Sequence, residues 1–188
     1  MPTVFSHALA AGALSRTAGH DASLRLTVVA ALCAVAPDLD VVSFALGIPY
    51  EAPFGHRGAS HSLVAAAALA SVLTPLLFRR AARPGVVWAV LFLATASHGL
   101  LDMLTSGGEG VAVAWPLTAE RFFFPVRPIR VSPIGADFFS ARGLATVWSE
   151  ALWIGLPSAA LLALTAWRRR ARSQTAAQPK HATAERAR

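Results

Sequence analysis

The sequence predicts an all-α integral membrane protein: a helical bundle with about three full transmembrane helices, preceded by one or two short or broken helices. Hydrophobic residues make up 55% of the 188 residues, charged residues make up 14%, and the mean hydropathy is +0.51. Soluble domains have about 45–50% apolar and about 25% charged residues. The composition therefore excludes an ordinary soluble enzyme, and it excludes a disordered chain, which needs low hydrophobicity.

Three apolar segments are expected to cross the membrane as full helices: residues 62–78, 86–104 and 151–167. Each segment has 17 to 19 residues, so each helix would be roughly 26–28 Å long. The hydrocarbon layer of a bilayer is about 30 Å thick, so each helix falls just short of that thickness.

Two weaker apolar segments precede these spans. Residues 4–14 cover only about half a span, and residues 24–36 end at Pro37, after which residues 41–48 are apolar again. Proline lacks a backbone donor and breaks a helix. We therefore expect short or broken helices here, packed on the three spans. The long segment 105–147 is expected to be a loop outside the membrane, and residues 168–188 a basic, disordered tail.

The positive charges predict the orientation of the chain. The net charge is +7, and 16 of the 17 basic residues are arginine. They lie beside the hydrophobic segments, which argues against a nucleic-acid partner and indicates topology signals. If the basic loops and the tail are cytoplasmic, that side carries 12 basic and 2 acidic residues, and the other side 5 and 8. We therefore expect a multi-pass protein of a bacterial inner membrane, in contact with its lipids.

This topology brings the ionisable residues of separate segments to one depth, near the outer face. Ionisable groups within a membrane protein usually mark a site or a cavity. We take the following as candidates: His7, Asp38, Asp40, His56, Arg57, His61, His98 and Asp102.

Three short motifs contain most of these candidates. His98 and Asp102 are four residues apart and share one helix face, where they could bind a metal or form a hydrogen bond within the bundle. Asp38 and Asp40 would point the same way in an extended segment, and two such carboxylates repel each other unless a cation lies between them. The alternative for this pair is a capping turn at a helix end.

The third motif is the run HRGASHS, which spans residues 56–62. Its two histidines flank a glycine, and Ser60 is expected to cap the span, which would place His61 in its first turn. Arg57 would favour the neutral, metal-binding form of the histidines, or it could bind a substrate anion. It could instead extend to lipid headgroups.

Together the motifs predict a metal site. Mixed sets of histidine and aspartate suit Zn²⁺, Mn²⁺ or Fe²⁺ better than Ca²⁺ or Cu⁺. Four histidines and three aspartates exceed one tetrahedral site, so either some of them support the ligands or two ions are bound. We expect one or two divalent ions, with zinc favoured and manganese the alternative.

At these residues the sequence resembles the YdjM-type inner-membrane proteins, which are described as membrane-bound metal-dependent hydrolases. The resemblance covers roughly residues 1–167 and implies one membrane-embedded, hydrolase-like domain. This family is in turn distantly similar to zinc-dependent phospholipase C and P1-type nucleases. Their order of ligands matches His7, then Asp38 or Asp40 with His56, then His98 and Asp102. Their later HxxxE element is missing, because no histidine precedes Glu150 by four residues.

The resulting hypothesis is a membrane-bound hydrolase that acts on a small or lipid-linked phosphoester at the outer interface. The expected metal ligands are His7, Asp40, His56, His98 and Asp102. Asp38 or His61 would be a further ligand or a general base, and Arg57 would stabilise negative charge on the substrate. Two other hypotheses remain open. One is a metal-ion or proton-coupled transporter, and the other is a non-catalytic protein whose polar cluster holds its helices together.

Overall fold

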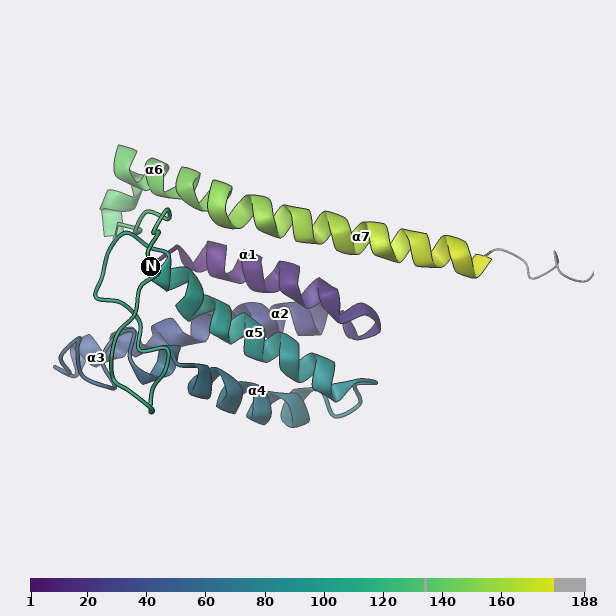
Figure 1. Cartoon of the computed structure of the whole chain (residues 1–188), viewed down its shortest axis with the longest axis horizontal. Helices are drawn as coiled ribbons and strands as arrows, with labels where there is room; N and C mark the ends of the chain where they lie inside the picture. The colour runs from purple at the N-terminus through teal and green to yellow at the C-terminus, as the bar shows by residue number, and fades with distance from the viewer. Residues whose placement is uncertain (134, 178–188) are drawn as a thin grey trace, which may run out of the picture.

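The computed structural model describes residues 1–133 and 135–177, and over these residues it is an all-helical bundle without a β-strand (Figure 1). The all-α prediction is confirmed. The helices are α1 (Val4–Ser15), α2 (Leu24–Val35), α3 (Val42–Ala45), α4 (Leu63–Leu77), α5 (Pro84–Met103), α6 (Ala141–Glu150) and α7 (Leu156–Ala177). Short helical turns join or precede them: η1 (Arg16–Asp21), η2 (Ala36–Val41), η3 (Ala59–His61), η4 (Gly135–Phe139) and η5 (Ala151–Gly155).

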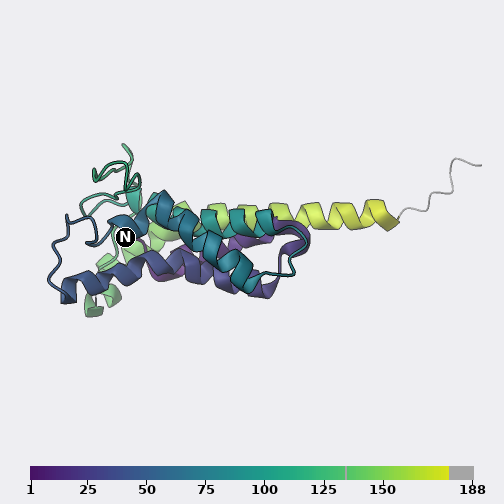
Figure 2. The same ribbon diagram turned by 90° about the horizontal axis from the view of Figure 1, so that it is seen from below.

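Helix α5 lies at the centre of the bundle. It packs against α1, α2 and α4, while α7 runs along α1 (Figures 1 and 2). The buried contact surfaces are rich in alanine, for example Ala11, Ala30, Ala70 and Ala94. Small side chains let helices approach closely, which is how helices associate within a membrane.

Three helical stretches are long and apolar enough to cross a membrane. They are Leu24–Ala45, Pro84–Met103 and Ala141–Thr175. Two of them confirm the expected spans at residues 86–104 and 151–167, and the third is not the expected one at residues 62–78. The prediction of a full span at residues 62–78 is wrong, because α4 has only 15 residues and is about 22 Å long. Residues 62 and 78 flank the helix rather than extend it, since Ser62 is the N-cap and Phe78 has left the helical conformation.

The expected break at Pro37 is also absent. The chain stays helical from α2 through η2 into α3, with Pro37 in the first turn of η2. Proline is tolerated in a first helical turn, where its missing N–H group has no required partner. The backbone tightens from α-helix to 3₁₀-helix at this point instead of stopping.

The last helix begins earlier and ends later than we expected. The loop does not reach residue 147, because Ser140 caps α6 and accepts a hydrogen bond from the backbone N–H of Arg142. Helix α7 continues through the arginine-rich residues 168–172 to Ala177, so the first part of the expected disordered tail is helical. The rest of that tail, residues 178–188, lies outside the described residues.

The two ends of the bundle differ in charge. The turn after α1, the connection between α4 and α5, and the C-terminal half of α7 meet at one end (Figure 1). There Arg83 pairs with Asp21 at 3.2 Å, and Arg169 donates to the backbone carbonyl of Arg16 at 3.1 Å. The candidate site residues lie at the opposite end.

Glu150 fastens the start of α1 to the end of α6. Its carboxylate accepts hydrogen bonds from the Thr3 backbone N–H and from the hydroxyls of Thr3 and Ser6, at 2.6–2.7 Å. Glu150 is buried, so these donors would lose their charged partner in Glu150→Ala. We expect this variant to unfold roughly 5–10 °C lower in mild detergent, from a loss of about 2–4 kcal/mol. The exposed Glu120→Ala is the matched control and should leave the melting temperature unchanged.

Candidate metal centre

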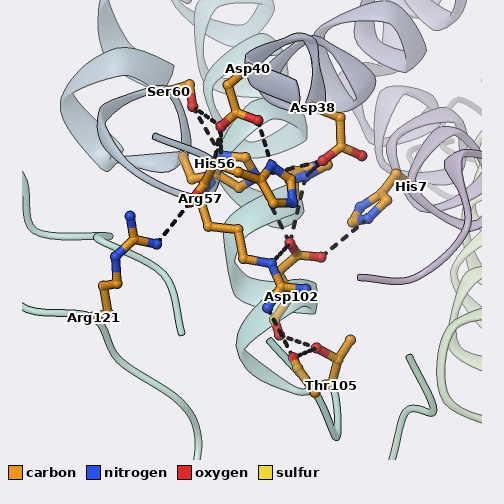
Figure 3. Close-up of polar contacts among 12 residues, drawn as sticks. His7, Asp38, Asp40, His56, Arg57, Ser60, Asp102, Thr105 and Arg121 are labelled. Carbon is orange, nitrogen blue, oxygen red and sulfur yellow. Dashed lines mark hydrogen bonds and ion pairs between the residues drawn. The ribbon is translucent and has the colours of Figure 1, made fainter. Parts of the chain in front are cut away.

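Four parts of the chain bring the candidate residues together at one end of the bundle (Figure 3). Helix α1 carries His7, η2 carries both aspartates, the segment ending in η3 carries His56, Arg57 and His61, and α5 carries His98 and Asp102. The structure therefore places all eight candidates in one cluster. His20 lies at the opposite end of the molecule, in the turn after α1.

Four buried residues form a group that could hold a metal ion: Asp38, His61, His98 and Asp102. We call them the four-residue group. Each offers one ligand atom, and these atoms lie within 4.8 Å of one another. His98 Nε2 is 3.2 Å from Asp38 Oδ1, and His61 Nε2 is 3.7 Å from the same oxygen. Asp102 lies one helical turn after His98 on α5, as the four-residue spacing predicts.

Hydrogen bonds fix the rings of both histidines in this group. His98 Nδ1 donates to the backbone carbonyl of Ala34 at 2.7 Å. His61 Nδ1 is hydrogen-bonded to Ser60 Oγ at 3.0 Å and lies 3.1 Å from Asp40 Oδ2. A histidine that donates through Nδ1 presents the lone pair of Nε2. Both Nε2 atoms face the carboxylates of Asp38 and Asp102, which is the arrangement that a metal-binding histidine needs.

The atoms that face the centre of the group lack hydrogen-bond partners. Within the described part of the chain, this holds for both carboxylate oxygens of Asp38 and Asp102 and for Nε2 of His61 and His98. Buried polar atoms are nearly always satisfied, so orphaned ones need an explanation. Here they are the preferred ligand types of zinc and manganese.

The charge of the cluster also favours the binding of a cation. Its side chains include the buried carboxylates of Asp38 and Asp102, the partly buried carboxylate of Asp40 and the guanidinium of Arg57. These four groups leave two negative charges when the histidines are neutral. Burial acts to lower the pKa of His61, but its contacts with Asp38 and Asp40 outweigh burial and raise it. The ring therefore lies in an excess of negative charge, which a divalent cation would neutralise.

His7 lies at the edge of the four-residue group. Its ring stacks on that of His98 with 3.9 Å between centroids, and its Nε2 is 3.6 Å from Asp102 Oδ1. Neither ring nitrogen has a hydrogen-bond partner among the described residues. His7 belongs to neither group of residues that could hold a metal ion, so its role as a ligand stays a prediction.

Asp40 supports the residues around it through several hydrogen bonds. It accepts from His56 Nδ1 at 2.6 Å, from the Arg57 backbone N–H at 3.0 Å and from the Ser60 hydroxyl. Ser60 is therefore not the N-cap of the next helix as we predicted, and Ser62 caps α4 instead.

Asp38, Asp40 and His56 form a second group of possible ligands. Asp38 belongs to both groups, although the expected extended segment is a 3₁₀-helix. Side chains two apart in a 3₁₀-helix point in different directions. Asp38 accordingly faces α5, whereas Asp40 faces the segment from His56 to His61.

Replacing Asp40 is expected to weaken metal binding without abolishing it. In Asp40→Asn the amide cannot accept all of the hydrogen bonds that now orient His56 and His61, so the ligand set loosens. Loss of such a supporting residue typically lowers metal affinity 10- to 100-fold. Competition with a fluorescent zinc chelator would measure this shift. Unchanged affinity in the variant would contradict the supporting role.

Arg57 is buried between the ligands and the long loop. Its Nε lies 2.9 Å from Asp102 Oδ2, and its Nη1 donates to the backbone carbonyl of Gly107 at 3.1 Å. Its backbone has a φ of +60°, which is uncommon for a side-chain-bearing residue and is found mostly where function requires it. The neighbouring Gly108 also has a positive φ, and any side chain there would collide with the guanidinium of Arg57.

Sequence reasoning missed the residues that hold this segment in place. Arg121 donates to the backbone carbonyls of His56 and Tyr50, and its guanidinium lies over the Tyr50 ring. Gly99 lets η3 approach α5, because a Cβ there would lie 2.9 Å from the His61 carbonyl oxygen. The arginine is 65 residues from His56 along the chain, so no local spacing could identify it, whereas the glycine within the run HGLLD was visible.

Comparison with known proteins confirms the resemblance stated from the motifs. Residues 1–174 match the protein family described as YdjM inner membrane protein. The inner membrane protein YbcI of Escherichia coli (strain K12) is 38% identical over 174 residues, which cover 90% of this chain and 100% of the relative. No solved structure matches the chain. The matched region includes every residue of the cluster.

Proposed function

This chain belongs to the family of YdjM inner membrane proteins, and from that premise we propose that it is a membrane-bound, metal-dependent hydrolase of phosphoesters. The observation that carries the proposal is the four-residue group, whose buried ligand atoms converge without hydrogen-bond partners within the described chain, with Arg57 as the ion-pair partner of Asp102. Arg57 beside it adds a group suited to a phosphate. The combination of a cation site and an adjacent guanidinium suits the hydrolysis of an anionic ester.

The side chains take distinct roles in this proposal. Asp38, His61, His98 and Asp102 would hold the ion, with His7 as a further ligand. A divalent ion bound there would lower the pKa of a bound water and polarise the scissile group. Arg57 would bind a non-bridging phosphate oxygen and stabilise the negative charge that develops on it.

His56 is the best-placed residue to accept a proton. Its Nδ1 is held by Asp40 at 2.6 Å, and its ring lines the cavity beside the cluster. In the proposed reaction, water adds to phosphorus and the ester P–O bond breaks. His56 takes the proton of the water and then gives it to the leaving oxygen, which departs as the alcohol. Asp40 would stabilise the resulting imidazolium, as a carboxylate behind a catalytic histidine does.

The charge distribution supports an outward-facing site. The arginines of η1, of the α4–α5 connection and of α7 gather at the end of the bundle opposite the cluster. Under the positive-inside rule this end is cytoplasmic, so the cluster would open toward the outer face.

An apolar interior argues against a transport path through the bundle. The core between the cluster and the arginine-rich end is made of residues such as Ala11, Leu26, Ala30 and Leu91. A transport site is expected near the membrane midplane, with polar groups that reach both faces. The one-sided placement of the ionisable residues supports the hydrolase.

The experiment that tests the proposal measures metal content and activity together. The untagged protein is purified in mild detergent without added metal, and metal per protein is measured by mass spectrometry. Hydrolysis is followed with p-nitrophenyl phosphate and bis(p-nitrophenyl) phosphate. We expect one or two equivalents of zinc or manganese and chelator-sensitive release of p-nitrophenol. A folded, metal-free protein that cleaves neither ester would overturn the proposal in favour of a structural polar cluster. Metal uptake into liposomes without ester cleavage would favour a transporter.

A further inference from the structure

A large apolar cavity opens beside the candidate metal centre. Its volume is about 600 Å³, which lies within the range of small-molecule sites. It is bounded by the start of α1, by the end of the η2–α3 helix, by the loop around residues 131–133 and by η4. Its wall on the side of the cluster is formed by His56 and Arg57. The cavity therefore joins an apolar space to the groups proposed to act on the phosphoester.

Most of the cavity lining is apolar, and much of it is exposed. Val4, Phe5, Val41, Phe44 and Phe139 all line it, and each is exposed over 42% or more of its surface. Val41 and Phe44 belong to the apolar stretch Leu24–Ala45, which is long enough to cross the membrane. The cavity therefore begins at the membrane-embedded part of the bundle and leads to the polar cluster.

We propose that this cavity binds the hydrocarbon chain of an amphiphilic phosphoester and so presents its phosphate to Arg57 and the metal centre. The inference rests on the proposed function and specifies its substrate class. A small soluble ester would use only the polar wall and would leave the apolar lining without a role. An amphiphile would place its chain against the apolar lining and its head at the wall formed by His56 and Arg57.

The proposal predicts a dependence on chain length. Transfer of one methylene from water to an apolar environment improves binding about fourfold at most. For p-nitrophenyl alkyl phosphodiesters below their critical micelle concentration, we expect kcat/KM to rise roughly two- to fourfold for each added methylene. The rise should stop once the cavity is full. Val4→Trp would occupy part of the cavity beside the start of α1, so it should reduce the rise more than it reduces the rate on the ethyl ester.

Matched surface variants distinguish an effect of the cavity on kcat/KM from a general effect of removing exposed apolar side chains in detergent. Phe5 and Phe139 line the cavity and are exposed over 75% and 90% of their surface. Leu24 and Leu117 lie outside it and are exposed over 77% and 91%. We expect the double variant Phe5→Ser/Phe139→Ser to lose at least tenfold in kcat/KM for the decyl ester. The double variant Leu24→Ser/Leu117→Ser should change it less than twofold.

A labelling experiment locates the chain independently of turnover. Dodecyl phosphate with a diazirine at the end of its chain is photolysed with the protein in lipid nanodiscs, and the labelled peptides are mapped by mass spectrometry. We expect label at the start of α1 and in residues 138–139, and we expect Val4→Trp to reduce it. Label spread over the lipid-facing helices, or rates that do not vary with chain length, would overturn the proposal. Label in the cavity without any ester cleavage would support the chain site and overturn the hydrolase function instead.

Discussion

Asp102→Asn is expected to empty the metal centre. Metal content should fall from about one equivalent or more to below roughly 0.1, and phosphoester hydrolysis should fall roughly a thousandfold. The reason is that Asp102 contributes a fully buried charged oxygen to the four-residue group. Asparagine preserves the volume of the side chain but offers a neutral and much weaker ligand. Mass spectrometry of the purified variant measures the metal, and p-nitrophenol release measures the rate.

Stability must be separated from metal binding in this experiment. Asp102 also pairs with Arg57, so the variant leaves a buried charge unpaired, at a cost of about 3–5 kcal/mol. Glu150→Ala is the matched control, since it removes another buried carboxylate that bonds only to Thr3 and Ser6 in the described chain. It should be destabilised and yet keep its metal. Metal retained by a folded Asp102→Asn variant would rule out the four-residue group as the binding site.

Arg57→Lys is expected to reduce catalysis while leaving the metal bound. We expect kcat to fall 10²- to 10³-fold on bis(p-nitrophenyl) phosphate, which is typical for the loss of one group that stabilises transition-state charge. Lysine keeps the positive charge beside Asp102. It cannot reproduce the planar fork that reaches both the carboxylate and the Gly107 carbonyl.

A second arginine provides the comparison for Arg57. Arg121 is bonded to the backbone carbonyls of Tyr50 and His56 and stabilises the same segment from outside. Arg121→Lys should lower the melting temperature more than it lowers kcat. If both variants lose activity in proportion to their loss of stability, Arg57 is a structural residue and not a catalytic one.

Local patterns in the sequence predicted the helical elements well. The apolar stretches at residues 4–14, 24–36 and 86–104 lie in α1, α2 and α5, because helices in lipid must satisfy their backbone groups internally. The four-residue spacing also placed His98 and Asp102 on one face of α5. Chain continuity was harder to predict. Pro37 predicts a break in the helix. The chain stays helical there because the first turn of the 3₁₀-helix η2 tolerates a proline.

The sequence by itself determined that this is a helical membrane protein with its candidate site residues gathered at one end. Hydropathy and charge are sums over neighbouring residues and can be read directly from the chain. The tertiary structure decided which side chains face each other. It directs Asp38 and His61 toward His98 and Asp102 and turns Asp40 toward His56, while Asp38 and Asp40 remain close enough to share a second group with His56. The direction of a side chain depends on local dihedral angles and on partners more than 15 residues away, which spacing alone does not specify.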